Sequence, residues 1–271
     1  MPEGHVIHRH AAALTEAFGG THPAVTSPQG RFASQAAGLD GSELLGAGAV
    51  GKHLFIEFDA PQPARIVHIH LGLIGKLVLH PLAPPVGQVR LRIAHQGVAA
   101  DLHGPQWCRL ITAEEEAEVR AGLGPDPLRA DALPAAAWQK VKRSRRAIGA
   151  LLMDQALFAG VGNIYRCEVL FRHGIAPARP GNRLTRRQFD LIWADLVELM
   201  AAGVATGRID TVRPQHSPEA MGRPPREDRH GGEVYVYRRA GQPCLVCGSP
   251  VVGSTLAGRK VYWCPTCQPE R

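Results

Sequence analysis

Residues 244–267, CLVCGSPVVGSTLAGRKVYWCPTC, hold two cysteine pairs in the spacing C-x2-C-x16-C-x2-C. Four thiolates in two such knuckles can complete a tetrahedral zinc shell on a short β-hairpin. In a reducing compartment such pairs more often hold metal than form disulfides. We therefore predict a zinc finger over residues 233–271, with one zinc ion bound by Cys244, Cys247, Cys264 and Cys267. Because four protein ligands leave no open position, this zinc would support folding and would not activate water.

Positive charge is concentrated in the second half of the chain. The net charge is +7, and residues 140–271 carry 21 Lys and Arg against 11 Asp and Glu, whereas residues 1–139 carry 10 against 13. This asymmetry favours a nucleic-acid partner, and a solvated charged face is the alternative. No apolar run approaches the about 18 residues that cross a membrane, and no signal peptide is visible, so we expect a cytoplasmic protein.

The hydrophobic pattern predicts an α+β chain. A helix over residues 5–18 and strands over 53–58, 65–70, 76–80 and 89–94 indicate an N-terminal β-sandwich domain with a flanking helix, residues 1–112. An acidic helix over 113–121 and the sequence Gly-Pro-Asp-Pro at 124–127 indicate a linker over 113–134.

A helical pattern follows the linker and predicts a second domain over residues 135–232. Its clearest helices are expected over 139–154, 163–172 and 185–202. Two glycines at 160 and 162 allow a sharp turn before the second of these helices, and amide groups at a helix N-terminus favour an anion such as phosphate. The Arg-, Pro- and His-rich stretch 208–232 has little apolar periodicity and is expected to be a mobile loop.

The first five residues, Met-Pro-Glu-Gly-His, suggest a nucleophile. An initiator Met before a small residue is normally trimmed, which would leave Pro2 with a free secondary amine. An α-amino group titrates near about 8 and a lysine near about 10.4, so at neutral pH the terminal amine is far more often the free nucleophile. Taken alone, Glu3 is equally an ordinary first-turn helix residue.

Five motifs, in order, make the whole chain resemble the formamidopyrimidine-DNA glycosylase and endonuclease VIII family of DNA repair enzymes. They are Pro-Glu-Gly at 2–4, Gly-Lys-His-Leu at 51–54, His-Leu-Gly-Leu at 70–73, Met-Asp-Gln at 153–155 with Gly-Val-Gly-Asn-Ile-Tyr at 160–165, and the finger with Arg259. The resemblance implies a sandwich, a helix–two-turn–helix domain and a zinc-finger hairpin. It also implies double-stranded DNA with oxidised bases or abasic sites as partner, no small-molecule cofactor and a monomer acting at the bacterial nucleoid.

The resemblance also implies a mechanism and a set of site residues. Pro2 would attack the sugar C1′ of a flipped-out nucleotide and form an imine, Glu3 would supply the acid, and Lys52 and Arg259 would grip the flanking phosphates. Strand cleavage by β,δ-elimination would follow. Further DNA contacts are expected from His70, from Asn163 to a phosphate, and from Leu73 as a wedge in the gap left by the base, with a core leucine as the alternative. Arg145, with Arg143 and Arg146 on the preceding helix, is a phosphate candidate from composition.

Gly4 and the loop over 101–107 favour the endonuclease VIII branch. The formamidopyrimidine branch follows Pro-Glu with Leu and carries an Arg-Arg-Phe loop, whereas here Gly4 follows and the loop reads DLHGPQW. Oxidised pyrimidines are therefore the expected substrates, and Gln106 or Trp107 is the candidate second wedge. The alternatives are an enzyme directed to 8-oxoguanine or formamidopyrimidines, a catalytically silent damaged-DNA-binding paralogue, and a zinc-ribbon protein of transcription or translation.

Overall fold

The computed structural model describes residues 2–227 and 232–270, in two compact units, the first ending at Gly122 and the second beginning at Leu123. The first unit is built from two antiparallel four-stranded sheets with the strand orders β2-β3-β4-β8 and β1-β6-β7-β5. These strands are β1 (Ala24–Thr26), β2 (Glu43–Val50), β3 (His53–Asp59), β4 (Ile66–His70), β5 (Lys76–Pro81), β6 (Val89–His95), β7 (Val98–His103) and β8 (Trp107–Ile111). The predicted β-sandwich is confirmed.

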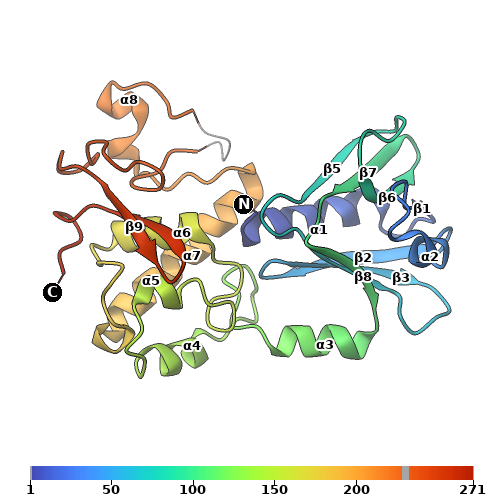
Figure 1. The fold of residues 1–271 in the computed structure, drawn as a ribbon, viewed down its shortest axis with the longest axis horizontal. Coiled ribbons are helices and arrows are strands. Elements are labelled where there is room, and N and C mark those ends of the chain that lie inside the picture. The colour runs from blue at the N-terminus through green and yellow to red at the C-terminus, as the bar shows by residue number, and fades with distance from the viewer. Residues whose placement is uncertain (1, 228–231, 271) are drawn as a thin grey trace. The chain divides into compact units, whose positions relative to one another are not determined.

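Alternation along the strands determines which side chains enter the core of the sandwich. In β3, Leu54, Ile56 and Phe58 are buried in the main core, which also receives Ile7, Leu14 and Phe18 from helix α1 (Gly4–Phe18). Helix α1 runs along the sandwich beside β2 and β3 (Figure 1). The chain therefore uses an apolar stripe of helical period and strands of period two to close one core.

The opposite face of the β2-β3-β4-β8 sheet has a separate, smaller cover. Phe55, Ile66 and Ile111 lie there against Val119 of helix α3 (Ala113–Ala121), which begins at a Thr112–Glu115 capping box. Helix α3 therefore belongs to the first unit, although it lies inside the predicted linker. The short helix α2 (Ala33–Ala37) completes this unit.

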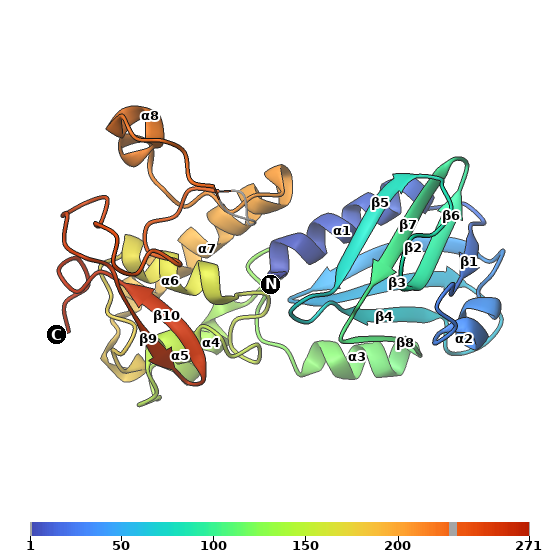
Figure 2. The same cartoon turned by 45° about the horizontal axis from the view of Figure 1, so that its top comes forward.

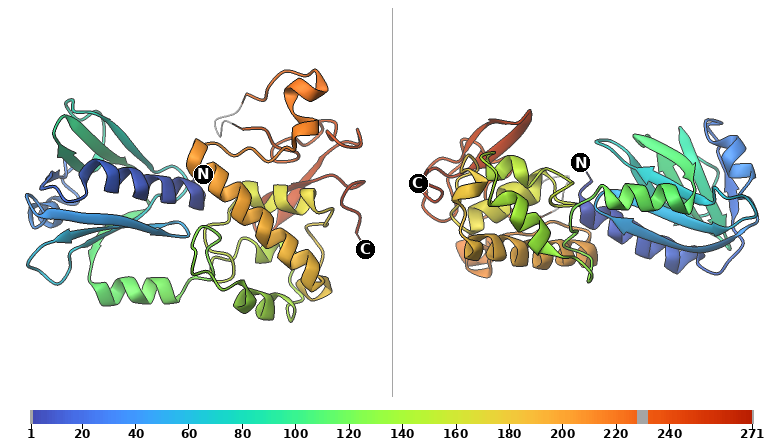
Figure 3. Two further views of the ribbon diagram at one scale, coloured as in Figure 1. Left: turned by 180° about the vertical axis from the view of Figure 1, so that it is seen from behind. Right: turned by 90° about the horizontal axis from the view of Figure 1, so that it is seen from below.

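The second unit is helical and ends in a two-stranded hairpin, as Figures 2 and 3 show from other sides. Its longer helices are α4 (Pro134–Val141), α6 (Asn163–Arg172) and α7 (Arg186–Thr206). The short ones are α5 (Ile148–Leu151), α8 (Pro218–Met221), η1 (Gly181–Arg183) and η2 (Pro214–His216), and the hairpin strands are β9 (Val252–Leu256) and β10 (Arg259–Trp263). Among the described residues, no helix combines the length and apolarity that a membrane crossing requires.

The prediction of one helix over 139–154 was wrong. Helix α4 ends at Val141 and α5 begins only at Ile148, because the intervening backbone pairs with the segment around Gly181. Gly181 N–H donates to Arg146 O at 2.9 Å, and Asn182 N–H donates to Ser144 O at 2.7 Å. Bonds to a distant segment thus replace the i to i−4 bonds that would have continued the helix.

The stretch 208–232 is not a plain loop. It contains η2 and α8, the latter begun by Ser217, whose hydroxyl oxygen accepts from Ala220 N–H at 3.2 Å. Part of the predicted mobile loop, residues 228–231, lies outside the described residues.

Candidate functional site

Strand pairing gathers the predicted residues of the first unit at one end of the sandwich. His53 pairs with His70, which pairs with Trp107, and Lys76 pairs with His103, so the turn at 51–52, the loop at 71–75 and the loop at 104–106 all lie at this end. Thr15, far along helix α1, hydrogen-bonds Ala47, which lies only three residues before the end of β2. The part of α1 before Thr15 extends toward that end, so the first turn of the helix reaches it. Figures 1 and 2 show the N-terminal end of α1 beside these turns.

Glu3 directly precedes α1 as its N-cap residue. Its side chain is almost fully buried, at 1% exposure, and does not cap the helix, while its carbonyl oxygen accepts from Val6 N–H at 3.0 Å. Pro2 is half-buried. The positive end of the helix dipole stabilises the ionised Glu3 carboxylate, in the residue next to the Pro2 amine.

Lys52 and His70 lie on adjoining hairpin elements. Lys52 is half-buried in the two-residue turn that joins β2 to β3, and Gly51 takes a positive φ of 60° there. The ring of His70 accepts from Gly72 N–H at its Nδ1 (3.1 Å) and stacks on Trp107 with ring centroids 4.5 Å apart. Trp107 is therefore part of the sheet, which leaves Gln106 as the candidate second wedge.

Leu73 lies on an exposed loop whose backbone is tightly closed. It is 60% exposed and its neighbour Ile74 is 80% exposed, so the core-leucine alternative is wrong. Gly75 N–H donates to Leu71 O at 3.0 Å, and a Cβ on Gly75 would meet that oxygen at 2.3 Å. Two large apolar side chains are thus held in solvent on a short, constrained loop, as a stacking wedge requires.

A histidine pair, which sequence reasoning missed, lies beside Lys52: His68 is fully buried and His53 is half-buried. Arg109 Nε donates to His68 Nδ1 at 3.2 Å, and His68 Nε2 lies 2.9 Å from His53 Nδ1. Since arginine can only donate, neutral His68 carries its proton on Nε2 and donates it to His53. The spacing His68-x-His70 could have predicted this cluster, because alternate residues of a strand lie on the same face of the sheet.

Burial keeps this cluster neutral. Burial first, and then the fields of His70, Arg109 and Lys52, lowers the pKa of His53 to about 4. The pKa of His68 falls to about 3 through burial and then the fields of His53, Arg109 and His70. Burial and Lys52 also lower the pKa of His70, and its hydrogen bond with Gln106 partly offsets that shift.

In the second unit, Asn163 is the first residue of α6 and is 8% exposed. The glycine turn before it is closed by Gln155, whose Oε1 accepts from Gly160 N–H (3.0 Å) and whose Nε2 donates to Val161 O (3.0 Å). Asn163 Oδ1 accepts from Arg166 Nη2, which orients the amide NH2 as the group that can donate to a ligand.

Fully buried Arg166 connects the turn to the finger. Its Nη2 also donates to Lys260 O on β10 at 2.8 Å, and its Nη1 donates to Gly149 O at 3.1 Å. Asn163 and the strand that begins at Arg259 are therefore joined through one guanidinium. Arg259 is exposed at the start of β10.

Arg145 lies on a different element from the one predicted. It is exposed in the loop between α4 and α5 and not on a helix, because the backbone there pairs with the segment around Gly181. Arg146 pairs with Asp154 at 2.9 Å. The structure gives Arg145 no link to Asn163 or the finger, so it stays a candidate from composition.

The four finger cysteines form a zinc-sized cluster. Their sulfur atoms all lie within 4.8 Å of one another, with 3.8 Å between the sulfurs of Cys244 and Cys267 and 3.4 Å between those of Cys247 and Cys264. Zinc–sulfur bonds of about 2.3 Å in a tetrahedron give sulfur separations of about 3.8 Å, so the residues fit one structural zinc ion.

An N-terminal sandwich, a helix–two-turn–helix turn and a four-cysteine finger in this order define a class of DNA-repair proteins, and family models match each part. The formamidopyrimidine-DNA glycosylase N-terminal domain matches residues 1–106, its H2TH domain residues 123–214, and the zinc finger found in FPG and IleRS residues 241–269. The chain belongs to the family of formamidopyrimidine-DNA glycosylases and endonuclease 8.

Individual relatives agree with this assignment. Endonuclease 8 1 of Mycobacterium tuberculosis (strain H37Rv) is 48% identical over 274 residues, covering 99% of this chain and 100% of the relative. The formamidopyrimidine-DNA glycosylase of Methylococcus capsulatus is 34% identical over 240 residues, covering 85% and 83%. The higher identity agrees with the predicted endonuclease VIII branch.

Solved structures share the fold. Lactococcus lactis formamidopyrimidine-DNA glycosylase bound to DNA with an abasic site matches with a TM-score of 0.78 at 22% identity, covering 99% of this chain and 100% of that one. The same enzyme with DNA containing N7-benzyl-Fapy-dG matches with a TM-score of 0.79 at 23% identity and the same coverage. The predicted α+β architecture is thereby confirmed.

Proposed function

We propose that this protein is a base-excision-repair DNA glycosylase and abasic-site lyase that acts through the amine of Pro2. The observation that carries the proposal is the gathering of the α1 start, Lys52, His70 and Leu73 at one end of the sandwich, in a chain of this family. Relatives named as endonuclease 8 and as formamidopyrimidine-DNA glycosylase support the activity.

The residues support a defined sequence of bond changes. The Pro2 nitrogen forms a bond to C1′ as the glycosidic bond breaks and its electron pair leaves with the base. The nitrogen then loses its N–H proton, and the base takes up one proton, so the charges balance. Glu3 then protonates the ring oxygen O4′ as the C1′–O4′ bond breaks, which gives an iminium between Pro2 and the opened sugar. Loss of a C2′ proton expels the 3′ phosphate, and loss of a C4′ proton then expels the 5′ phosphate.

The remaining site residues position the DNA in this proposal. Lys52, Arg259, Asn163 and His70 contact phosphates, and Leu73 fills the space left by the flipped nucleotide. Zinc supports the finger that carries Arg259. Gly4 and the endonuclease 8 relative favour oxidised pyrimidines as substrates. Because DNA is the proposed substrate, we expect the enzyme to act at the bacterial nucleoid.

Borohydride trapping tests the proposal. Wild-type protein, with removal of Met1 checked by intact mass, should form a covalent adduct with duplexes that contain an abasic site or 5-hydroxyuracil, and more slowly with 8-oxoguanine. Pro2→Gly, whose trimmed chain keeps a terminal amine but loses the secondary amine and its fixed φ, should form the adduct much more slowly, whereas Pro85→Gly, in an exposed loop, should leave it unchanged. If trimmed wild-type protein traps no lesion but binds damaged duplex, the catalytic proposal fails and the protein is a damage-binding paralogue.

A further inference from the structure

An arginine occupies a turn position that favours glycine. Arg239 N–H donates to Val236 O at 3.0 Å, which closes a four-residue turn with Arg238 in its third position at a φ of 55°. This left-handed conformation strains any residue with a Cβ, and turns of this kind prefer glycine or asparagine there. The other described non-glycine residues with positive φ, Gln96 and Ala257, lie in two-residue hairpin turns that require it.

The turn is held from both sides. The buried Glu168 carboxylate accepts the N–H groups of Tyr235, Val236 and Tyr237 at 2.7, 2.9 and 2.8 Å. On the other side, the Arg239 guanidinium donates to Tyr235 O at 2.5 Å and to Pro243 O at 2.9 Å. Strained backbone persists where its surroundings over-determine it, and it concentrates at functional positions.

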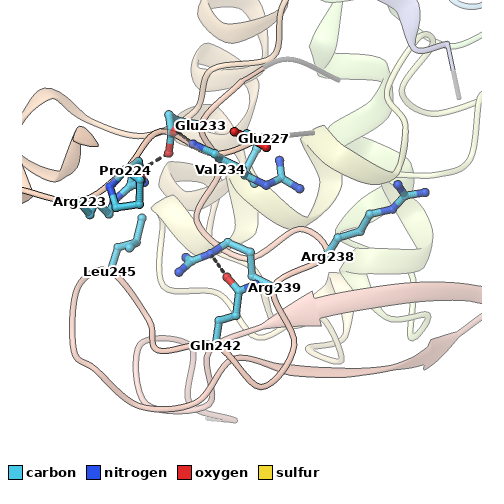
Figure 4. Close-up of a pocket in the computed structure, with 10 residues that line it drawn as sticks. Arg223, Pro224, Glu227, Glu233, Val234, Arg238, Arg239, Gln242 and Leu245 are labelled. Carbon is cyan, nitrogen blue, oxygen red and sulfur yellow. Dashed lines mark hydrogen bonds and ion pairs between the residues drawn. The ribbon is translucent and has the colours of Figure 1, made fainter. Parts of the chain in front are cut away.

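The side chain that this turn presents borders a pocket of about 420 Å³ lined by four arginines. Three of them are engaged by protein acceptors: Arg223 pairs with Glu233 at 2.7 Å, Arg226 donates to backbone carbonyls, and Arg239 is bound as described above. Arg238 differs, because it is exposed and its guanidinium lies 5.4 Å from the ring centre of Tyr237. Figure 4 shows it extending away from Arg239 and Gln242.

We propose that Arg238 is a DNA-binding residue that contacts a backbone phosphate at the mouth of this pocket, an inference that rests on the proposed function. A planar guanidinium with five donors matches phosphate oxygens, and Tyr237 and the clamped turn reduce the freedom that the side chain loses on binding. The engaged arginines add a positive field, with Glu227 and Glu233 as the acidic residues of the lining.

The Arg238→Gly variant tests the proposal because it has opposite effects on folding and on binding. Glycine relieves the left-handed backbone, so the melting temperature should stay equal or rise. Affinity for a duplex with a tetrahydrofuran abasic analogue should fall by about tenfold, since a charged hydrogen bond is lost. The negative slope of the log of the binding constant against the log of the salt concentration should become shallower by about 1. Arg238→Lys should keep most of that slope.

Arg187→Ala is the matched control, because it removes one exposed positive charge from α7 of the same unit. Unchanged affinity and salt slope in Arg238→Gly, or an equal loss in Arg187→Ala, would overturn the phosphate contact. If Arg238→Gly does not fold, the strain argument is refuted, and Arg238→Gln, which keeps the Cβ and removes the charge, decides the contact. Wild-type protein that binds no duplex would refute the proposed function itself.

Discussion

The His53–His68 pair makes the first unit less stable in acid, and the His68→Asn variant isolates the contribution of His68. The folded protein holds His68 and His53 neutral chiefly because burial disfavours the charged rings. In addition, protonating His68 Nδ1 would set a proton against the Arg109 Nε–H that it now accepts. In the unfolded chain both rings have ordinary pKa values near about 6.5. A histidine pKa that is lower in the folded state means that stability is complete above about 6.5 and is lost as the pH falls toward the folded values.

The magnitude follows from the shifts to about 4 for His53 and about 3 for His68. At pH 5 each ring carries nearly one proton in the unfolded chain and almost none in the folded chain. This difference lowers the free energy of unfolding by about 2 kcal/mol per histidine relative to pH 7.5. The pair therefore removes about 4 kcal/mol in the wild type and His53 alone about 2 kcal/mol in His68→Asn. Asparagine Oδ1 can still accept from Arg109.

The assay is urea unfolding at pH 7.5 and 5.0, followed by ¹⁹F NMR of 5-fluorotryptophan. Trp107 is the one tryptophan of residues 1–122, so its resonance, identified by its loss in Trp107→Phe, reports on the first unit. The variant is expected to be less stable at pH 7.5, and only the difference between the two pH values tests the reasoning. An equal drop in wild type and variant would show that folded His68 already binds a proton at pH 5.

Three further predictions concern single contacts. Zinc analysis should find one metal per chain, lost in Cys264→Ser and kept in Cys108→Ser; a stoichiometric zinc content in Cys264→Ser would contradict the four-cysteine site. Glu168→Gln should lower the free energy of unfolding in urea by about 2 kcal/mol or more. The carboxylate accepts three backbone N–H groups on two oxygens, whereas a glutamine amide accepts only on its one oxygen. Wild-type stability of the variant would refute that role. Gly72→Ala combines a φ of 68° with a Cβ 2.9 Å from Gln106 Cβ, whereas Gly87→Ala has a φ of 72° and open space. Both should cost about 1–2 kcal/mol for the backbone, and only Gly72→Ala should also weaken lesion binding; equal binding by both would show that the loop tolerates the shift.

Local sequence was sufficient wherever neighbouring residues determine the structure. The helix over 163–172 has the observed bounds of α6, and the predicted strands correspond to β3, β4, β5 and β6. The cysteine spacing sufficed for the finger because both knuckles and the hairpin between them are local. The five motifs located the family for the same reason.

Tertiary contacts decided the rest. The break after Val141 arises from pairing with residues about 35 positions away, which no local pattern records. The backbone acceptors of Arg166, on Gly149 and Lys260, and the backbone donors to Glu168 likewise come from distant segments, although two charged residues inside the apolar helix α6 were a usable signal.

The sequence by itself determined the α+β class, the finger ligands and the residue types of the site, because periodicity, spacing and side-chain chemistry are properties of the linear chain. Only the tertiary structure decided that Leu73 is exposed, that Trp107 stacks on His70, and that Arg238 takes a strained, outward-facing turn. The stacking of Trp107 depends on strand register, since a one-residue change of register would have turned its side chain to the opposite face of the sheet. The positions of Leu73 and Arg238 depend on closed loops and turns, and the Arg238 turn is held by Glu168 from a segment far away in the sequence.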